Sequence, residues 1–130
     1  LGRRGDTHAA GELMARVGAP ELVDRHAAAL AYADAKRVEL AVALAGAPLL
    51  LLLDEPTAGL GLAERTPMME AVRAATVTGV AVLFTEHDMD VVFGFADRVI
   101  VLDRGRVIAT GTPEAVRADA AVRRAYLGDG

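Results

Sequence analysis

The feature that most constrains this chain is a run of five leucines, residues 49–53, that ends directly in Asp54 and Glu55. A run this short with a proline close to each end favours a β-strand over a helix, and its uniform apolarity predicts a strand buried on both faces. Such a run is far shorter than the roughly 20 residues that a membrane-spanning helix needs. The run is therefore expected to be a strand inside a sheet.

Most of the remaining apolar residues recur at helical spacing. This periodicity predicts helices at residues 9–17, 34–45, 62–77, 89–95 and 120–127. Two short helices are also expected, one opened by Pro20 and one capped by Thr112, and Asp88 is expected to cap the helix at 89–95. Pro67 lies inside the helix predicted at 62–77, so that helix either begins with Thr66 as its cap or bends at Pro67.

Two further strand signals follow the leucine run. Residues 80–84 are rich in β-branched and aromatic side chains and predict a second buried strand. Residues 99–102 and 107–109 flank a turn that contains Gly105, which predicts a β-hairpin. The order helix, strand, helix, strand, hairpin and helices predicts an α/β fold, and 130 residues suffice for one domain.

The charge and composition exclude several functions. A net charge of -4 and a pI near 5.3 argue against binding to nucleic acid, which normally requires a basic face. The absence of cysteine excludes disulfides, thiolate metal sites and cysteine nucleophiles. The basic residues at the start of the chain are followed by polar ones, so no secretory signal peptide is expected there.

Asp54 and Glu55 stand where a predicted strand enters a loop, which is the placement that nucleotide hydrolysis requires of its acids. Asp54 is expected to hold Mg²⁺ beside the phosphates, directly or through water. Glu55 can polarise a water molecule for in-line attack on the γ-phosphate. The alternative is an ordinary buried strand whose acids only cap the next turn, and the spacing alone does not decide between the two.

His87 follows the second predicted strand as the acids follow the first. Because ligands bind at the carboxyl ends of strands in open α/β sheets, Asp54, Glu55 and His87 are expected to converge there. A histidine after a strand is more often a capping or surface residue, but this setting favours a functional role. His8 and His26 have no such setting and are expected to face solvent.

With these motifs the chain resembles the ATP-binding cassette (ABC) ATPases. Residues 49–56 resemble their Walker B strand, with Glu55 as the catalytic glutamate, and His87 resembles their switch histidine. Residues 86–98 look closest to the subunits that power branched-chain amino-acid importers, and residues 111–114 and 125–128 resemble those subunits too. Two more segments resemble nucleotide-binding motifs, the signature motif with Ala31, Tyr32, Ala33 and Asp34, and the D-loop with Ala58, Gly59, Leu60 and Gly61.

The resemblance implies a fold and a division of the chain. The chain would be the C-terminal half of a RecA-like P-loop NTPase domain, the ABC ATPase domain, together with the end of its helical subdomain. Residues 1–47 would form the end of the helical subdomain and the signature helix. Residues 48–110 would carry Walker B, the D-loop and the switch histidine, and residues 111–130 would form the C-terminal helices.

The resemblance also implies a function and partners. The chain would belong to an ATP-hydrolysing subunit that uses ATP and Mg²⁺ and is peripheral to the cytoplasmic face of the cell membrane. Its partners would be a second ATPase subunit, whose ATP the signature motif contacts in trans, and the transmembrane permease subunits. A periplasmic substrate-binding protein would be an indirect partner, and no nucleic acid is expected.

The chain departs from the family pattern in several places, which include Gly61 and Leu62, where Asn or Asp and then Pro are usual, and an unexpected Pro67. The phosphate-binding loop (Walker A), Gly-x-x-x-x-Gly-Lys-[Ser/Thr], does not occur in it, so these 130 residues alone are not expected to bind ATP usefully. Ser and Gly are usual where Ala31 and Ala33 stand. Ala31 lacks a hydroxyl that would contact the γ-phosphate, and the methyl of Ala33 is strained if its φ is positive.

Two other functions stay open. A catalytically weak cassette half could act as a structural or regulatory partner; Ala31 and Ala33 favour this alternative, whereas Glu55 and His87 favour a working transport ATPase. A cassette protein of DNA repair or translation would carry long coiled coils or basic arms. The acidic pI and the transporter-like C-terminal segment argue against that class.

Overall fold

The computed structural model describes residues 6–128, which divide into a first compact unit that ends at Glu86 and a second that begins at His87. Two short 3₁₀ turns, Pro20–Leu22 and Ala27–Ala29, follow the first helix of the first unit. The longer elements of that unit are α1 (Asp6–Arg16), α2 (Tyr32–Ala45), β1 (Leu50–Asp54), α3 (Leu62–Val77) and β2 (Ala81–Thr85).

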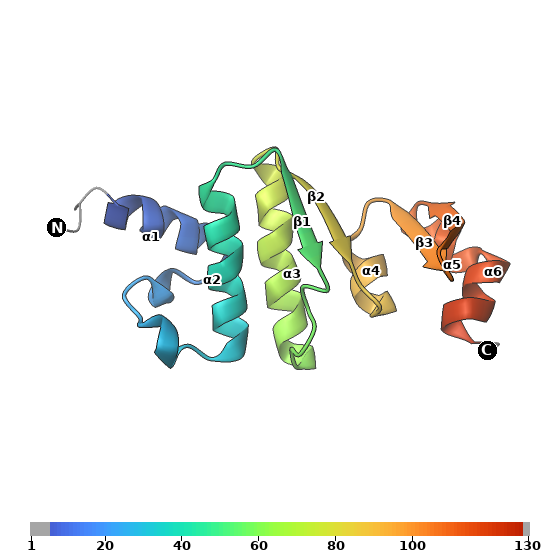
Figure 1. The fold of residues 1–130 in the computed structure, drawn as a ribbon, viewed down its shortest axis with the longest axis horizontal. Coiled ribbons are helices and arrows are strands. Elements are labelled where there is room, and N and C mark those ends of the chain that lie inside the picture. The colour runs from blue at the N-terminus through green and yellow to red at the C-terminus, as the bar shows by residue number, and fades with distance from the viewer. Residues whose placement is uncertain (1–5, 129–130) are drawn as a thin grey trace. The chain divides into compact units, whose positions relative to one another are not determined.

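The two strands of the first unit pair in parallel, with α3 as the connection between them. Leu50 lies opposite Ala81, and Asp54 at the end of β1 lies opposite Thr85 at the end of β2. Figure 1 shows α2 and α3 side by side, with the β1–β2 pair next to α3. This β–α–β arrangement of strands and crossover helix confirms the α/β fold class.

The prediction that the leucine strand is buried on both faces is wrong for the described chain. Leu51 is 5% exposed, whereas its neighbours Leu50 and Leu52 are 52% and 66% exposed. Alternate side chains of a strand point to opposite faces, so only one face of the sheet is covered. Leu83 of β2 is also exposed. Burial on both faces needs helices on both, and within residues 6–86 the helices cover only one.

Local signals placed the long helices of the first unit to within a few residues. The helix predicted at 34–45 begins two residues earlier, at Tyr32. The helix at 62–77 has the predicted bounds, so the alternative start at Thr66 is wrong and Pro67 lies in the second turn of α3. The N-terminus of α3 is stabilised at Gly61, whose N–H donates to the Glu64 carboxylate over 2.8 Å.

The second unit is a hairpin with helices around it. Its elements are α4 (Met89–Phe95), β3 (Val99–Asp103), β4 (Arg106–Gly111), α5 (Pro113–Ala118) and α6 (Ala120–Val122), followed by a π-helical turn over Arg123–Leu127. The predicted hairpin is confirmed, with Arg104 and Gly105 both at positive φ in its turn. The helix predicted at 120–127 is thus divided between α6 and the π-helical turn.

Small apolar side chains form the core of the second unit. Val92 of α4, Val99 of β3, Val116 of α5 and Val122 of α6 are buried together. Within residues 6–128, no helix is long and apolar enough to cross a membrane. The division of the chain at residues 47 and 110, expected from the resemblance, stays a prediction.

Candidate functional site

The carboxyl end of β1 presents the two predicted acids to solvent. Asp54 is the last residue of the strand, Glu55 is the next residue, and both are exposed. Their placement follows from the leucine run, because the strand ends at the first charged residue after the leucines, Asp54. The sheet therefore delivers both carboxylates to one accessible loop.

Thr85 joins these two acids. Its hydroxyl donates to Oδ1 of Asp54 over 2.5 Å and accepts the N–H of Glu55 over 3.1 Å. The Glu55 N–H also lies 3.0 Å from the Thr85 carbonyl oxygen. Thr85 was not among the site residues predicted from the sequence. Its signal was the register, since parallel pairing of the two predicted strands puts the residue after the second strand beside the acids.

Glu55 has a strained backbone. Its φ is +46°, in the left-handed region that residues with a Cβ rarely occupy. Such a conformation costs roughly 1–3 kcal/mol and persists only where the surroundings impose it. Here the Glu55 N–H is bonded to Thr85, and the Glu55 carbonyl accepts the N–H of Ala58 over 3.0 Å. Strain at an exposed acid supports a functional role for it.

The turn after Glu55 is anchored by Thr57. This residue is 3% exposed, and the carboxylate of Glu86 accepts both its N–H, over 2.9 Å, and its hydroxyl, over 2.6 Å. Neither Thr57 nor Glu86 was among the site residues predicted from the sequence. Thr57 follows the recognised acids and Glu86 precedes His87, but no local pattern shows that the two side chains meet.

The two segments predicted as signature motif and D-loop lie together in the structure. The Tyr32 hydroxyl donates to the Ala58 carbonyl over 3.3 Å. Gly59 has a φ of +76°, and a Cβ placed on it would lie 3.0 Å from Cε1 of Tyr32. Glycine is therefore favoured at this position both by the backbone conformation and by the close approach of the tyrosine ring. Leu60 is buried, and Gly61 is the N-cap of α3.

The signature segment forms the start of α2. Ala31 is the N-cap in extended conformation and makes no side-chain capping bond, while Tyr32, Ala33 and Asp34 form the first helical turn. Ala33 is therefore helical and not at positive φ, so the strain considered for its methyl group is absent. The exposed ring of Tyr32 also carries the Lys36 ammonium, 5.5 Å from the ring centroid.

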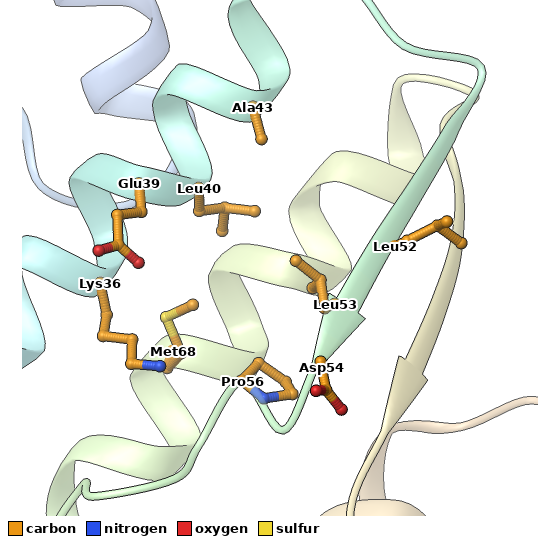
Figure 2. Close-up of a pocket in the computed structure, with 9 residues that line it drawn as sticks. All are labelled: Lys36, Glu39, Leu40, Ala43, Leu52, Leu53, Asp54, Pro56 and Met68. Carbon is orange, nitrogen blue, oxygen red and sulfur yellow. The ribbon is translucent and has the colours of Figure 1, made fainter.

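A cavity of about 200 Å³ lies between α2, β1 and α3. Figure 2 shows Leu40 and Ala43 of α2 across this cavity from Leu53, with Met68 of α3 and the Lys36 side chain at its lower end. The Leu52 side chain points away from the helices, in agreement with its exposure. The lining is mainly apolar, and Glu55 is not part of it.

The histidines differ in setting. His87 is exposed and is the first residue of the second unit, so its convergence with Asp54 and Glu55 stays a prediction. The next residue, Asp88, caps α4 as predicted, because its carboxylate accepts the N–H of Asp90 over 3.0 Å. His8 and His26 are exposed, as expected.

The acids suit Mg²⁺ by their chemistry. This ion is usually held by one or two carboxylates together with water and substrate phosphates, and seldom by a complete cage of protein ligands. Asp54 offers one exposed carboxylate whose orientation is set by Thr85, with Glu55 adjacent. No group of three or more acidic, histidine or cysteine side chains that could hold a metal occurs in the described part of the chain. The exposed carboxylate of Asp54, with Glu55 beside it, fits an ion that arrives with a phosphate ligand.

Comparisons of the sequence point to transport proteins. Residues 4–58 match the family described as ABC transporter, and residues 106–130 match that described as branched-chain amino acid ATP-binding cassette transporter. LivG of Escherichia coli, a high-affinity branched-chain amino acid transport ATP-binding protein, is 40% identical over 115 residues, 88% of this chain and 45% of LivG. BraF of Pseudomonas aeruginosa, of the same description, is 37% identical over 114 residues, 87% of this chain and 45% of BraF.

Solved structures share the fold. MJ1267, an ATP-binding cassette of an ABC transporter in its ADP conformation, has a TM-score of 0.85 at 26% identity, over 99% of this chain and 52% of that one. CbiO1 of Clostridium perfringens, part of the ABC transporter complex cbiONQ, has a TM-score of 0.81 at 32% identity, over 95% of this chain and 50% of that one. The chain spans about half the length of the relatives it matches. The structural matches to MJ1267 and CbiO1 confirm the expected cassette fold.

Proposed function

Because this chain belongs to the ATP-binding cassette (ABC) transporter family, we propose that it supplies the hydrolytic acids of an ATPase subunit that powers the import of branched-chain amino acids. The observation that supports this proposal most is the pair Asp54 and Glu55 at the exposed end of a parallel strand. Thr85 sets the orientation of the first acid, and the second has a strained backbone.

Each acid has a separate task in this proposal. Glu55 orients the attacking water molecule by accepting a hydrogen bond from it. It then accepts a proton from this water as the water attacks the γ-phosphate. Asp54 takes part in holding Mg²⁺, which when bound neutralises charge on the phosphate oxygens. His87 would contact the γ-phosphate from the loop after β2. The Thr85 bonds keep both acids in place before nucleotide arrives, so that little reorganisation is needed in the transition state.

The segment at the start of α2 is proposed to contact the ATP that a second ATPase subunit holds. Its first turn, Tyr32, Ala33 and Asp34, has backbone N–H groups at the positive end of a 14-residue helix, a setting that favours phosphate. We infer that this turn, with the D-loop at residues 58–61, faces the nucleotide held by a second ATPase subunit. The phosphate-binding loop that the chain lacks would belong to the remainder of the full-length protein.

The transported substrate is proposed from the relatives. LivG and BraF are described as ATP-binding proteins of branched-chain amino acid transport, and residues 106–130 match the corresponding family. Permease subunits would then be the membrane partners, a periplasmic substrate-binding protein an indirect one, and the cytoplasmic face of the membrane the location. The absence of a membrane-spanning helix within residues 6–128 is compatible with a peripheral subunit.

Reconstitution tests the proposal at two levels. The full-length protein is assembled with its permease subunits in proteoliposomes, and ATP hydrolysis and uptake of labelled leucine, isoleucine and valine are measured, with Glu55→Gln as the inactive control. We expect the parent to hydrolyse ATP and take up substrate, and the Glu55→Gln control to do neither. Hydrolysis without uptake of any of the three would remove the substrate class. No hydrolysis by the parent would favour a structural or regulatory cassette half.

A further inference from the structure

Glu86 and Thr57 form a contact that the proposed function does not use. They lie 29 residues apart, yet one oxygen of the glutamate, Oε1, accepts both the N–H and the hydroxyl of Thr57. Thr57 is the one buried polar or charged residue found in the described chain, and Glu86 is half-buried. Burial of a hydroxyl without a partner is costly, so this pair is tightly coupled.

The contact bears directly on Glu55. Thr57 is two residues further along the turn, and Pro56 between them is buried. The turn begins with the left-handed conformation of Glu55, which must be imposed by bonds on both sides of it. Thr85 supplies those on the strand side. The two bonds from Thr57 to Glu86 supply those on the loop side.

We propose that Glu86 is a positioning residue for ATP hydrolysis, which fixes through Thr57 the turn that carries Glu55. This inference rests on the proposed role of Glu55 as the residue that orients the attacking water. Glu86 acts as a hydrogen-bond acceptor and not through its charge. Both bonds end on one carboxylate oxygen, and the amide oxygen of a glutamine can accept the same two.

Four variants distinguish hydrogen-bond acceptance by Glu86 from an effect of its charge. In the full-length protein, Glu86→Gln keeps an acceptor at the same place without the charge. Glu86→Ala removes the acceptor. Thr57→Val removes only the hydroxyl donor and nearly preserves side-chain volume. Glu21→Ala, which removes an exposed acid of the same unit, is the matched control. For each variant kcat and KM for ATP are measured, with the thermal unfolding midpoint as a record of folding.

The expected pattern separates positioning from other roles. Glu86→Ala lowers kcat about tenfold while KM for ATP stays within about threefold, because the turn of Glu55 loosens but the nucleotide contacts remain. Glu86→Gln retains most of the parent rate, and Thr57→Val lies between the two. The double variant Glu86→Ala with Thr57→Val is no slower than Glu86→Ala alone, since both changes break one link.

Three outcomes would overturn the inference. Equal losses of kcat in Glu86→Gln and Glu86→Ala would assign the role to the charge. A parent-like kcat in Glu86→Ala, even with a lowered unfolding midpoint, would make the contact merely structural. If Glu86→Ala does not fold, a parent-like kcat in Thr57→Val has the same force. Glu55→Gln distinguishes failure of the proposed function from failure of this inference. If Glu55→Gln hydrolyses ATP like the parent, the proposed function fails. If Glu55→Gln is inactive while Glu86→Ala keeps the parent kcat, only the inference about Glu86 fails.

Discussion

Asp54 and Thr85 occupy paired positions at the ends of two parallel strands, and the Thr85 hydroxyl donates a hydrogen bond of 2.5 Å to the Asp54 carboxylate. The same hydroxyl accepts the backbone N–H of Glu55. One side chain thus orients the acid proposed for Mg²⁺ and holds the backbone of the acid proposed for hydrolysis. Both proposed functions of the loop would therefore depend on a residue of the neighbouring strand.

Replacement of Thr85 tests that dependence. Thr85→Val removes the hydroxyl while keeping a β-branched side chain, so Asp54 loses its donor and Glu55 one of its two acceptors. A hydrogen bond to a charged group contributes about 1.5–3 kcal/mol, so we expect at least a tenfold loss of kcat/KM for Mg-ATP in the full-length protein. Thr85→Ser, which retains the hydroxyl, should stay close to the parent. Equal rates for all three proteins would contradict the role.

Glu55→Gln tests the proposed hydrolytic residue. The amide has the same shape and the same cost at positive φ, but it does not accept the proton of the attacking water. Turnover in the full-length dimer should fall by at least about 100-fold, a loss in the range that general-base catalysis contributes, while the affinity for ATP is unchanged. Single-turnover hydrolysis and equilibrium nucleotide binding measure the two quantities. Single-turnover hydrolysis within about threefold of the parent would show that Glu55 is not the base.

Ala31→Ser combined with Ala33→Gly tests the altered signature segment. Ala31 is an N-cap without a capping side chain, so serine should stabilise α2 by about 0.5–2 kcal/mol and offer a hydroxyl to phosphate. Ala33 is already helical, so Ala33→Gly relieves no strain and instead destabilises the helix by about 0.5–1 kcal/mol. We expect a gain in ATP turnover well below the roughly 10- to 150-fold that one charged hydrogen bond could give.

The single variants divide this effect. Ala31→Ser alone should carry most of the gain, and ATP affinity of the isolated subunit should not change, because the segment is proposed to meet nucleotide only across the dimer. Tighter binding by the isolated subunit, measured by titration calorimetry, would contradict the trans arrangement.

Gly59→Ala tests the approach of Tyr32 to the D-loop. Gly59 and Gly79 both have positive φ, +76° and +90°, but only at Gly59 would a Cβ meet another side chain, Cε1 of Tyr32 at 3.0 Å. Gly79→Ala should therefore cost only the backbone strain, roughly 1–2 kcal/mol, and Gly59→Ala more. Thermal unfolding midpoints of the two variants provide the comparison. In a protein that already carries Tyr32→Ala, Gly59→Ala should lower the unfolding midpoint only as much as Gly79→Ala does. Equal midpoints for the two single glycine variants would disprove the contact between Gly59 and Tyr32.

Several features could be predicted because they depend on near neighbours in the chain. The bounds of α3, the hairpin turn at Arg104 and Gly105, and the caps formed by Asp88 and Thr112 follow from side chains that act on backbone groups a few residues away. The strand that ends at Asp54 was likewise evident from five apolar residues followed by two acids. The ABC family could be recognised because its motifs are such local strings.

Tertiary structure alone decided the contacts around these local features. Thr85 reaches Asp54 across 31 positions of sequence, Thr57 reaches Glu86 across 29, and Tyr32 reaches Ala58 across 26. Such pairs depend on strand register and on helix packing, which no short pattern encodes. Burial was decided in the same way: five identical leucines predicted one uniform strand, but the side of the sheet covered by helices separates Leu51 from Leu50 and Leu52. The acids were thus determined by the sequence, and what holds them was determined by the packing of distant segments.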